Sequence, residues 1–92
     1  MIESIQHKGL RLLFEDDNPS KLPPHLVERI REILSLLDVA DTIEQLNLSG
    51  YRLHKLTGDL REFYSVRVSG NYRIIFRFDD GSVFDVDYLD YH

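Results

Sequence analysis

Alternation of apolar and polar residues toward the C-terminal end constrains the fold of this chain more than any other feature. The segments Phe63 to Val68 and Tyr72 to Phe78 roughly alternate, and Val83 to Leu89 continues the pattern. A period of two residues is typical of strands that bury one face. The segments are separated by Ser69 to Asn71 and by Asp79 to Ser82, whose Gly, Asn and Asp residues favour tight hairpins. We therefore predict a three-stranded antiparallel meander.

The same alternation gives each face of the predicted sheet a chemical character. One face carries the arginines Arg67, Arg73 and Arg77. In the third strand the period places Phe84 on the opposite, apolar face and Asp85 on a solvated edge. The first two strands supply the rest of that apolar face, namely Tyr64, Val66, Val68, Tyr72, Ile74, Phe76 and Phe78. The sheet is thus predicted to have a core face and a basic face.

The first half of the chain has mainly helical patterns. We interpret Ile2 to Gln6 as an edge strand of the sheet and His7 to Glu15 as a short helix. Pro24 suits the start of a second helix, because the first turn does not use the donor that proline lacks. Apolar residues then recur at helical spacing: Leu26, Ile30, Ile33, Leu34 and Leu37. Asp41 is the expected cap of a short helical turn. We predict an α+β fold with N-terminal helices packed on one face of a small antiparallel sheet.

Composition limits the class of protein. The 92 residues are expected to form one domain, 1–92, and the absence of cysteine excludes disulfides and thiolate metal sites. No two histidines lie three to five residues apart, so we expect no metal and no cofactor. No apolar run approaches the roughly 18 residues of a membrane span, and we see no signal peptide. We therefore expect a soluble cytoplasmic protein.

Charge is distributed unevenly along the chain. Residues 1–50 carry five basic and nine acidic side chains, residues 51–78 carry six and two, and residues 79–92 carry none and five. The net charge of −5 argues against broad nonspecific binding of nucleic acid, because long-range attraction to phosphate depends on the summed field. A local phosphate site in the basic middle third is compatible with this distribution.

Three segments resemble one known family. The opening MIESIQHKGLRLLFE, the segment YRLHKLTGDLREFYSVRVSGNYRIIFRF and the ending DVDYLDYH resemble the HigB toxins, also called plasmid maintenance system killer proteins, of the RelE/ParE superfamily. The resemblance implies a RelE-like microbial RNase fold. It also implies a bacterial type II toxin, a metal-independent endoribonuclease that cleaves mRNA in the A site of the 70S ribosome. The implied partner is a HigA-like helix-turn-helix antitoxin, with operator DNA bound only through the toxin–antitoxin complex.

The resemblance also implies where the site lies. The family uses a histidine before the meander, an arginine that opens the middle strand and the terminal residues, here His54, Arg73, Asp90, Tyr91 and His92. We expect His92 and His54 to transfer protons and Asp90 to orient a histidine or act as a base. Arg73 suits the negatively charged phosphorane because its guanidinium stays charged and presents a fixed fork of donors. Tyr91 is expected to stack on a base or to bond to phosphate.

Four further basic residues are expected to hold flanking phosphates: Lys55, Arg61, Arg67 and Arg77. Ordinary explanations compete with these assignments. Taken alone, His54 is more often a loop histidine bonded to a backbone carbonyl, and His92 a frayed terminus. For Arg77, which lies beside the acidic turn, a surface ion pair is as good an explanation as RNA contact.

Two other functions stay open on the sequence alone. The first is a ParE-like protein that inhibits a topoisomerase by binding and cleaves nothing. The second is a catalytically inactive partner that binds only its antitoxin or operator. The ending Asp90-Tyr91-His92 favours the nuclease, because ParE-like proteins generally lack a histidine and an aspartate at this position.

Overall fold

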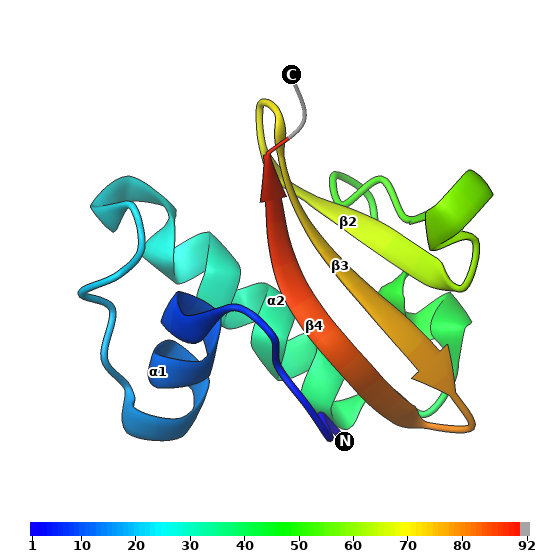
Figure 1. Cartoon of the computed structure of the whole chain (residues 1–92), viewed down its shortest axis with the longest axis horizontal. Coiled ribbons are helices and arrows are strands. Elements are labelled where there is room, and N and C mark those ends of the chain that lie inside the picture. The colour runs from blue at the N-terminus through cyan, green and yellow to red at the C-terminus, as the bar shows by residue number, and fades with distance from the viewer. Residues whose placement is uncertain (91–92) are drawn as a thin grey trace.

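A four-stranded antiparallel sheet, in the order β1-β2-β3-β4, organises the part of the protein that the computed structural model describes, residues 1–90 (Figure 1). The strands are β1 His54–Lys55, β2 Phe63–Ser69, β3 Tyr72–Asp79 and β4 Ser82–Asp90. The last three confirm the predicted meander. The strand β1 was not expected, because two residues are too few to show a period.

Two helices precede the sheet. The helix α1 is Lys8–Asp16, and α2 is Val27–Val39, preceded by the 3-10 turn η1 at Pro24–Leu26. The short turns η2 and η3 are Ile43–Leu46 and Gly58–Leu60. Figure 1 shows α1 and α2 on the same side of the sheet, as predicted. Neither helix within residues 1–90 is long and apolar enough to cross a membrane.

The caps of the helices differ in one place from the prediction. At α1, His7 is the N-cap, and its Nδ1 accepts a hydrogen bond from the backbone N–H of Leu10 at 3.2 Å. At η2 the N-cap is Thr42 rather than Asp41. The backbone N–H of Asp41 donates to the Gln45 side chain at 2.6 Å. The prediction for Asp41 was wrong because its neighbour Thr42 can cap the same turn, and Gln45 completes that cap.

The core lies between α2 and the sheet. Every residue of the predicted apolar stripe of α2 is buried, which confirms the helical period. The stripe packs with Val66, Ile74 and Phe76 in one cluster, and neither Ile74 nor Phe76 exposes any surface. Burial of each large apolar side chain contributes about 1.5–3 kcal/mol, so this layer stabilises the sheet on which the candidate site lies.

The N-terminal segment, residues 1–6, lies along β4 and extends the sheet. The backbone N–H of Glu3 donates to the carbonyl of Val83 at 2.7 Å, and the N–H of Val86 donates to the carbonyl of Ser4 at 3.1 Å. The pairing is parallel, with bridges from Ile2 to Val83 and from Ile5 to Val86. This confirms the predicted edge strand and covers the outer edge of β4.

A bulge in β4 changes the face on which one side chain lies. Asp85 has a left-handed backbone, with φ of 54°, and the register between β3 and β4 shifts there. Because of the extra residue, Phe84 lies opposite Arg77, on the basic face. The prediction that Phe84 faces the core was therefore wrong. Val83 and Val86, both fully buried, point to the core instead.

Candidate active site

The uncovered face of the sheet carries the first group of predicted site residues. His54 lies directly opposite Ser65, and Arg67 lies directly opposite Arg73. Directly opposed residues of an antiparallel pair project to the same face, and residues two apart on one strand share a face. His54, Arg67 and Arg73 therefore share one face, away from the side that α1 and α2 cover. This confirms the basic face that the alternation predicted.

The register also sets the separation between His54 and Arg73. They are two strand spacings of about 4.8 Å and one two-residue step of about 6.7 Å apart, which places their Cα atoms about 12 Å from each other. Ser65 and Arg67 of β2 lie between them, and Ile75 of β3 lies opposite Ser65. Ser65 and Ile75 form the floor of this surface and are only 2% and 5% exposed.

The turn between β2 and β3 holds Arg73. Its Nη1 donates to the carbonyl of Gly70 at 3.1 Å and to the carbonyl of Tyr72 at 3.3 Å. Gly70 has a φ of 52°, a left-handed conformation that glycine adopts without strain. Because the turn is closed in this way, the guanidinium stays at this end of the sheet. Arg73 is also directly opposite Leu89 of β4, so the end of β4 lies beside it.

Asp90 lies at the same end of the sheet but projects from the other side. It is directly opposite Tyr72, which stacks on Tyr88 with ring centroids 5.3 Å apart. Burial, followed by the negative charges of Tyr72 and Asp90, raises the pKa of Tyr88 to about 12. The register thus places Asp90 on the tyrosine side and Arg73 on the open side, one residue apart along the strands. The remaining predicted site residues, Tyr91 and His92, lie outside the described residues.

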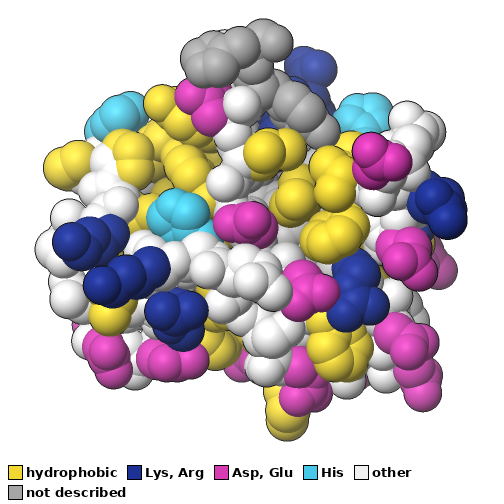
Figure 2. All heavy atoms as spheres, viewed as in Figure 1, with side chains coloured by type: hydrophobic (Ala, Val, Ile, Leu, Met, Phe, Trp, Pro, Cys, Tyr) yellow, Lys and Arg dark blue, Asp and Glu magenta, His cyan; other side chains and the backbone are white. Residues whose placement is uncertain are grey.

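The charged surface is mixed rather than uniformly basic. On the face drawn in Figure 2, acidic side chains lie among the lysines and arginines, and apolar side chains fill a broad area between them. Such a surface generates little long-range attraction for phosphate, in agreement with the net charge of −5. Recognition of an anion here depends on local contacts.

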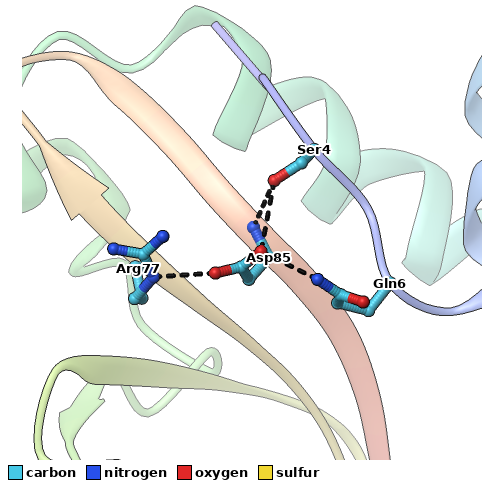
Figure 3. Close-up of polar contacts among 4 residues, drawn as sticks. All are labelled: Ser4, Gln6, Arg77 and Asp85. Carbon is cyan, nitrogen blue, oxygen red and sulfur yellow. Dashed lines mark hydrogen bonds and ion pairs between the residues drawn. The ribbon is translucent and has the colours of Figure 1, made fainter.

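Arg77 shares the open face but has an acidic partner. Its Nε donates to Asp85 Oδ2 at 2.8 Å, as Figure 3 shows, and its guanidinium carbon is 5.4 Å from the centre of the Phe84 ring. The carboxylate offsets the charge that was expected to attract phosphate. The ion pair supports the competing explanation for Arg77, and RNA contact by this residue stays a prediction.

Asp85 is a structural hub rather than a solvated edge residue, so that prediction was wrong. Its Oδ1 accepts hydrogen bonds from Gln6 Nε2 at 2.8 Å and from Ser4 Oγ at 3.4 Å (Figure 3). Its backbone N–H donates to Ser4 Oγ at 2.8 Å. The bonds from Gln6 and Arg77 hold the pKa of the Asp85 carboxyl below its usual value. The bulge thereby joins the N-terminal segment to β3.

The other two basic candidates lie apart from His54 and Arg73. Lys55 projects to the face opposite His54, where its Nζ lies 4.7 Å above the centre of the Tyr64 ring. Arg61 is exposed at the end of η3 and donates to the carbonyl of Gly58 at 3.5 Å. Of the four predicted phosphate contacts, Arg67 is the one that the register brings next to Arg73.

Three hollows on the surface lie away from His54, Arg67 and Arg73. Two hollows of about 320 and 460 Å³ both include Arg31 in their lining, the first between α1 and α2 and the second between residues 19–24 and α2. A third, of about 270 Å³, is lined by Lys55, Glu62, Arg77, Phe78 and Asp79 at the far end of β3. None of these three hollows is lined by His54, Arg67 or Arg73.

Sequence reasoning missed two contributions to this surface. Ser65 is a buried polar residue in the floor, and its place in the alternation of β2 carries no signal of that role. Arg29 of α2 reaches the loop before β1, although the helical period assigns it to the polar side of α2. A helical period reports which residues avoid the core, but not what their side chains reach.

Comparisons with known proteins identify the family and agree with the fold. Residues 3–92 match the family model described as the RelE-like toxin of type II toxin–antitoxin system HigB. The chain is 44% identical to Endoribonuclease HigB of Proteus vulgaris over 92 residues, the whole of both chains. It is 34% identical to Toxin HigB-1 of Vibrio cholerae over 94 residues, which covers all of this chain and 98% of the other.

Two solved structures share the fold. YafQ from E. coli strain BL21(DE3) superposes with a TM-score of 0.65 at 14% identity, over 98% of this chain and 91% of YafQ. The toxin–antitoxin complex YoeB–YefM of Staphylococcus aureus contains a chain that superposes with a TM-score of 0.62 at 20% identity, over 100% of this chain and 95% of that one. At these identities the likeness establishes the architecture alone.

Proposed function

The chain belongs to the HigB-like family of RelE-like toxins of type II toxin–antitoxin systems, and from this membership we propose that it is a ribosome-dependent, metal-independent mRNA endoribonuclease. It cleaves mRNA in the A site of the 70S ribosome and thereby inhibits translation. The relative from Proteus vulgaris, which is identical at 44% of positions along its whole length, is named an endoribonuclease and supports this activity.

One observation carries the proposal for this chain. His54 and Arg73 project from the same uncovered face, across a floor of Ser65 and Ile75. An imidazole and a guanidinium in this relation match the needs of RNA cleavage, a proton carrier and a fixed cation on either side of one phosphodiester. Leu89 of β4 is directly opposite Arg73, so the last strand ends at the same end of the sheet as this arginine.

The proposed reaction is an attack by the ribose 2′-hydroxyl on the adjacent phosphorus. A base accepts the proton of the 2′-hydroxyl while the oxygen bonds to phosphorus, and the bond from phosphorus to the 5′ oxygen breaks. An acid protonates the departing 5′ oxygen, so the products are a 2′,3′-cyclic phosphate and a 5′-hydroxyl. We assign the two proton transfers to His92 and His54, with Asp90 as orienting group or base. Arg73 stabilises the phosphorane.

The remaining assignments concern RNA and protein partners. Tyr91 stacks on a nucleobase or bonds to the phosphate, and Arg67 holds a neighbouring phosphate, with Lys55, Arg61 and Arg77 farther along the strand of RNA. A HigA-like helix-turn-helix antitoxin neutralises the toxin in the cytoplasm, and the complex binds operator DNA through the antitoxin. All of these functions belong to one domain, residues 1–92.

The proposal is tested with ribosomes programmed with a short labelled mRNA. We expect the purified protein to cut the A-site codon and to leave 2′,3′-cyclic phosphate and 5′-hydroxyl ends. The same RNA without ribosomes should be cut far more slowly, because a net charge of −5 provides little encounter attraction. Ends with a 5′-phosphate would exclude attack by the 2′-hydroxyl. An intact message together with inhibition of a topoisomerase would replace the proposal by the ParE-like function.

A further inference from the structure

A side chain of α2 contacts the loop that leads to His54. The Nη2 atom of Arg29 donates to the carbonyl of Gly50 at 2.8 Å and to the carbonyl of Arg67 at 3.2 Å. Its guanidinium carbon lies 4.2 Å from the centre of the Tyr51 ring. One residue of the helix therefore joins the loop before β1 to the strand β2.

Tyr51 is fixed from three directions. It is 8% exposed, and its hydroxyl donates to Glu32 Oε2 of α2 at 3.2 Å. Burial, followed by the charge of Glu32, raises the pKa of Tyr51, so the hydroxyl keeps the proton that it donates. Its carbonyl accepts a hydrogen bond of 2.6 Å from the backbone N–H of Arg67. With the Arg29 guanidinium on its ring, Tyr51 cannot shift without breaking contacts to both α2 and β2.

The backbone directly after Tyr51 needs such an anchor. Gly50 and Arg52 have φ values of 91° and 49°, both in the left-handed region. That region is unfavourable for an arginine, and a residue stays there only where surrounding contacts hold it. Its neighbour Tyr51 is held by contacts to Arg29, Glu32 and the backbone of Arg67. The conformation of the loop is thus imposed from α2 and β2 rather than by local preference.

The anchored loop sets the position of His54 relative to Arg73. Both backbone groups of Arg67 are used, its N–H by Tyr51 and its carbonyl by Arg29. Arg67 is directly opposite Arg73, and two residues along β2, Ser65 is directly opposite His54. The same contact therefore fixes the loop that carries the histidine and the strand that pairs with the arginine.

We propose that Arg29 is a positioning residue for RNA cleavage, which holds the loop at Tyr51 so that the His54 imidazole keeps its place across the sheet from Arg73. The inference rests on the proposed function. Arg29 itself lies on the helix side of the loop and acts through His54, so its loss should lower the rate of the chemical step and leave RNA binding nearly unchanged.

The test compares Arg29→Met with Arg31→Met. Both remove a guanidinium from α2, but Arg31 pairs with Asp17 and Glu28, away from the loop. We expect Arg29→Met to lower the single-turnover cleavage rate at saturating toxin by roughly 10- to 100-fold, the scale of an ångström-size displacement. The half-saturating concentration should change by less than about twofold. Arg31→Met should change neither quantity. Equal rates for Arg29→Met and wild type would overturn the inference.

A double-mutant cycle separates positioning from loss of stability. In a His54→Ala background, Arg29→Met should lower the rate by less than about twofold, because the residue through which it acts is already absent. An undiminished second loss would refute action through His54. Arg29→Lys keeps the charge and much of the stem while it loses the fork, so it provides a folded variant if Arg29→Met does not fold. We expect it to be slower than wild type, and a wild-type rate would count against the inference.

A readout independent of cleavage separates this inference from the proposed function. The imidazole NMR signals of His54 should shift in Arg29→Met and stay unchanged in Arg31→Met. If wild type does not cut programmed ribosomes, the proposed function fails, whatever these signals show. If wild type cuts and the His54 signals are the same in Arg29→Met, the positioning role of Arg29 fails and the proposed function stands.

Discussion

Replacement of Asp85 by asparagine tests how the bulge in β4 is held. Asparagine keeps the size of the side chain and tolerates a left-handed backbone, so the φ of 54° is not disturbed. What is lost is the negative charge that accepts hydrogen bonds from Arg77 and Gln6, each at 2.8 Å. The substitution therefore removes the charge of the Asp85 side chain and leaves the backbone geometry of the bulge in place.

The contacts set the size of the effect. The Arg77 and Asp85 side chains are 40% and 29% exposed, so their ion pair is largely solvated. Such a pair contributes about 0.5–1 kcal/mol. Loss of the charge weakens the bonds from Gln6 and Ser4 by about 0.5 kcal/mol in total. We expect Asp85→Asn to lower the free energy of unfolding by about 1–1.5 kcal/mol, which lowers Tm by about 5–10 °C in a domain of this size.

The effect should depend on pH in one direction. The pKa of Asp85 in the folded protein lies below its ordinary value of 3.8, so the charge stabilises the fold above that value. As pH falls below 3.8, the carboxylate becomes protonated first in the unfolded protein and then in the folded protein, and the stabilisation is lost. The difference in unfolding free energy between wild type and Asp85→Asn should therefore be full at pH 7 and smaller at a pH below 3.8.

Urea and thermal unfolding of both proteins at these two pH values measure the prediction. Asp85→Gly and Asp85→Ala form a matched pair, because both remove the carboxylate but only alanine is strained at positive φ. Alanine should be the less stable of the two by about 1 kcal/mol. A Tm of Asp85→Asn equal to that of wild type at neutral pH would refute the reasoning. So would a difference in unfolding free energy that does not change with pH.

Three further predictions concern the site and the core. Arg73→Ala should lower the single-turnover cleavage rate by about 100-fold, equivalent to about 3 kcal/mol of transition-state stabilisation. Its Tm should be nearly unchanged. Wild-type activity in the folded variant would remove Arg73 from the mechanism. Phe76 exposes no surface, so Phe76→Ala should cost about 3–5 kcal/mol in urea unfolding, and a loss below about 1 kcal/mol would show that the core repacks. For Tyr88, a pKa raised from 10 to about 12 means that the fold loses stability as pH rises through this interval. Between pH 10 and about pH 12, the unfolding free energy of wild type should therefore fall more than that of Tyr88→Phe. Equal decreases in the two proteins would contradict the raised pKa of Tyr88.

The strands and the main helix were predictable because burial imposes a period that side chains record. The ends of β2, β3 and β4 agree with the alternation to within one residue, and the buried stripe of α2 follows its spacing. The bulge was not predictable in this way. Period counting assumes a uniform strand, and the left-handed backbone at Asp85 inserts one residue that moves Phe84 to the other face. The alternation contains no sign of it.

The site was predictable in its faces and less so in its contacts. The alternation placed Arg67 and Arg73 together, and the structure confirms the shared face. The sequence does not indicate that Asp85 neutralises Arg77, because Asp85 approaches through the bulge. Nor does it indicate that Lys55 points away from His54, since β1 is too short for a period. The anchoring of the loop by Arg29 depends on how α2 crosses the sheet, which is a property of the packed layers.

The parallel pairing of residues 1–6 with β4 has a consequence for the order in which the protein assembles. β4 lies between β3 and the N-terminal segment, so residues 1–6 pair with partners some 80 positions away, as the bond between the Met1 amine and the Gly81 carbonyl illustrates. Contacts of such high sequence separation close late in folding. Until β4 pairs with β3, the sheet has no final strand and Leu89 does not yet lie opposite Arg73. The surface that carries Arg73 is therefore finished only when the most distant parts of the chain have come together.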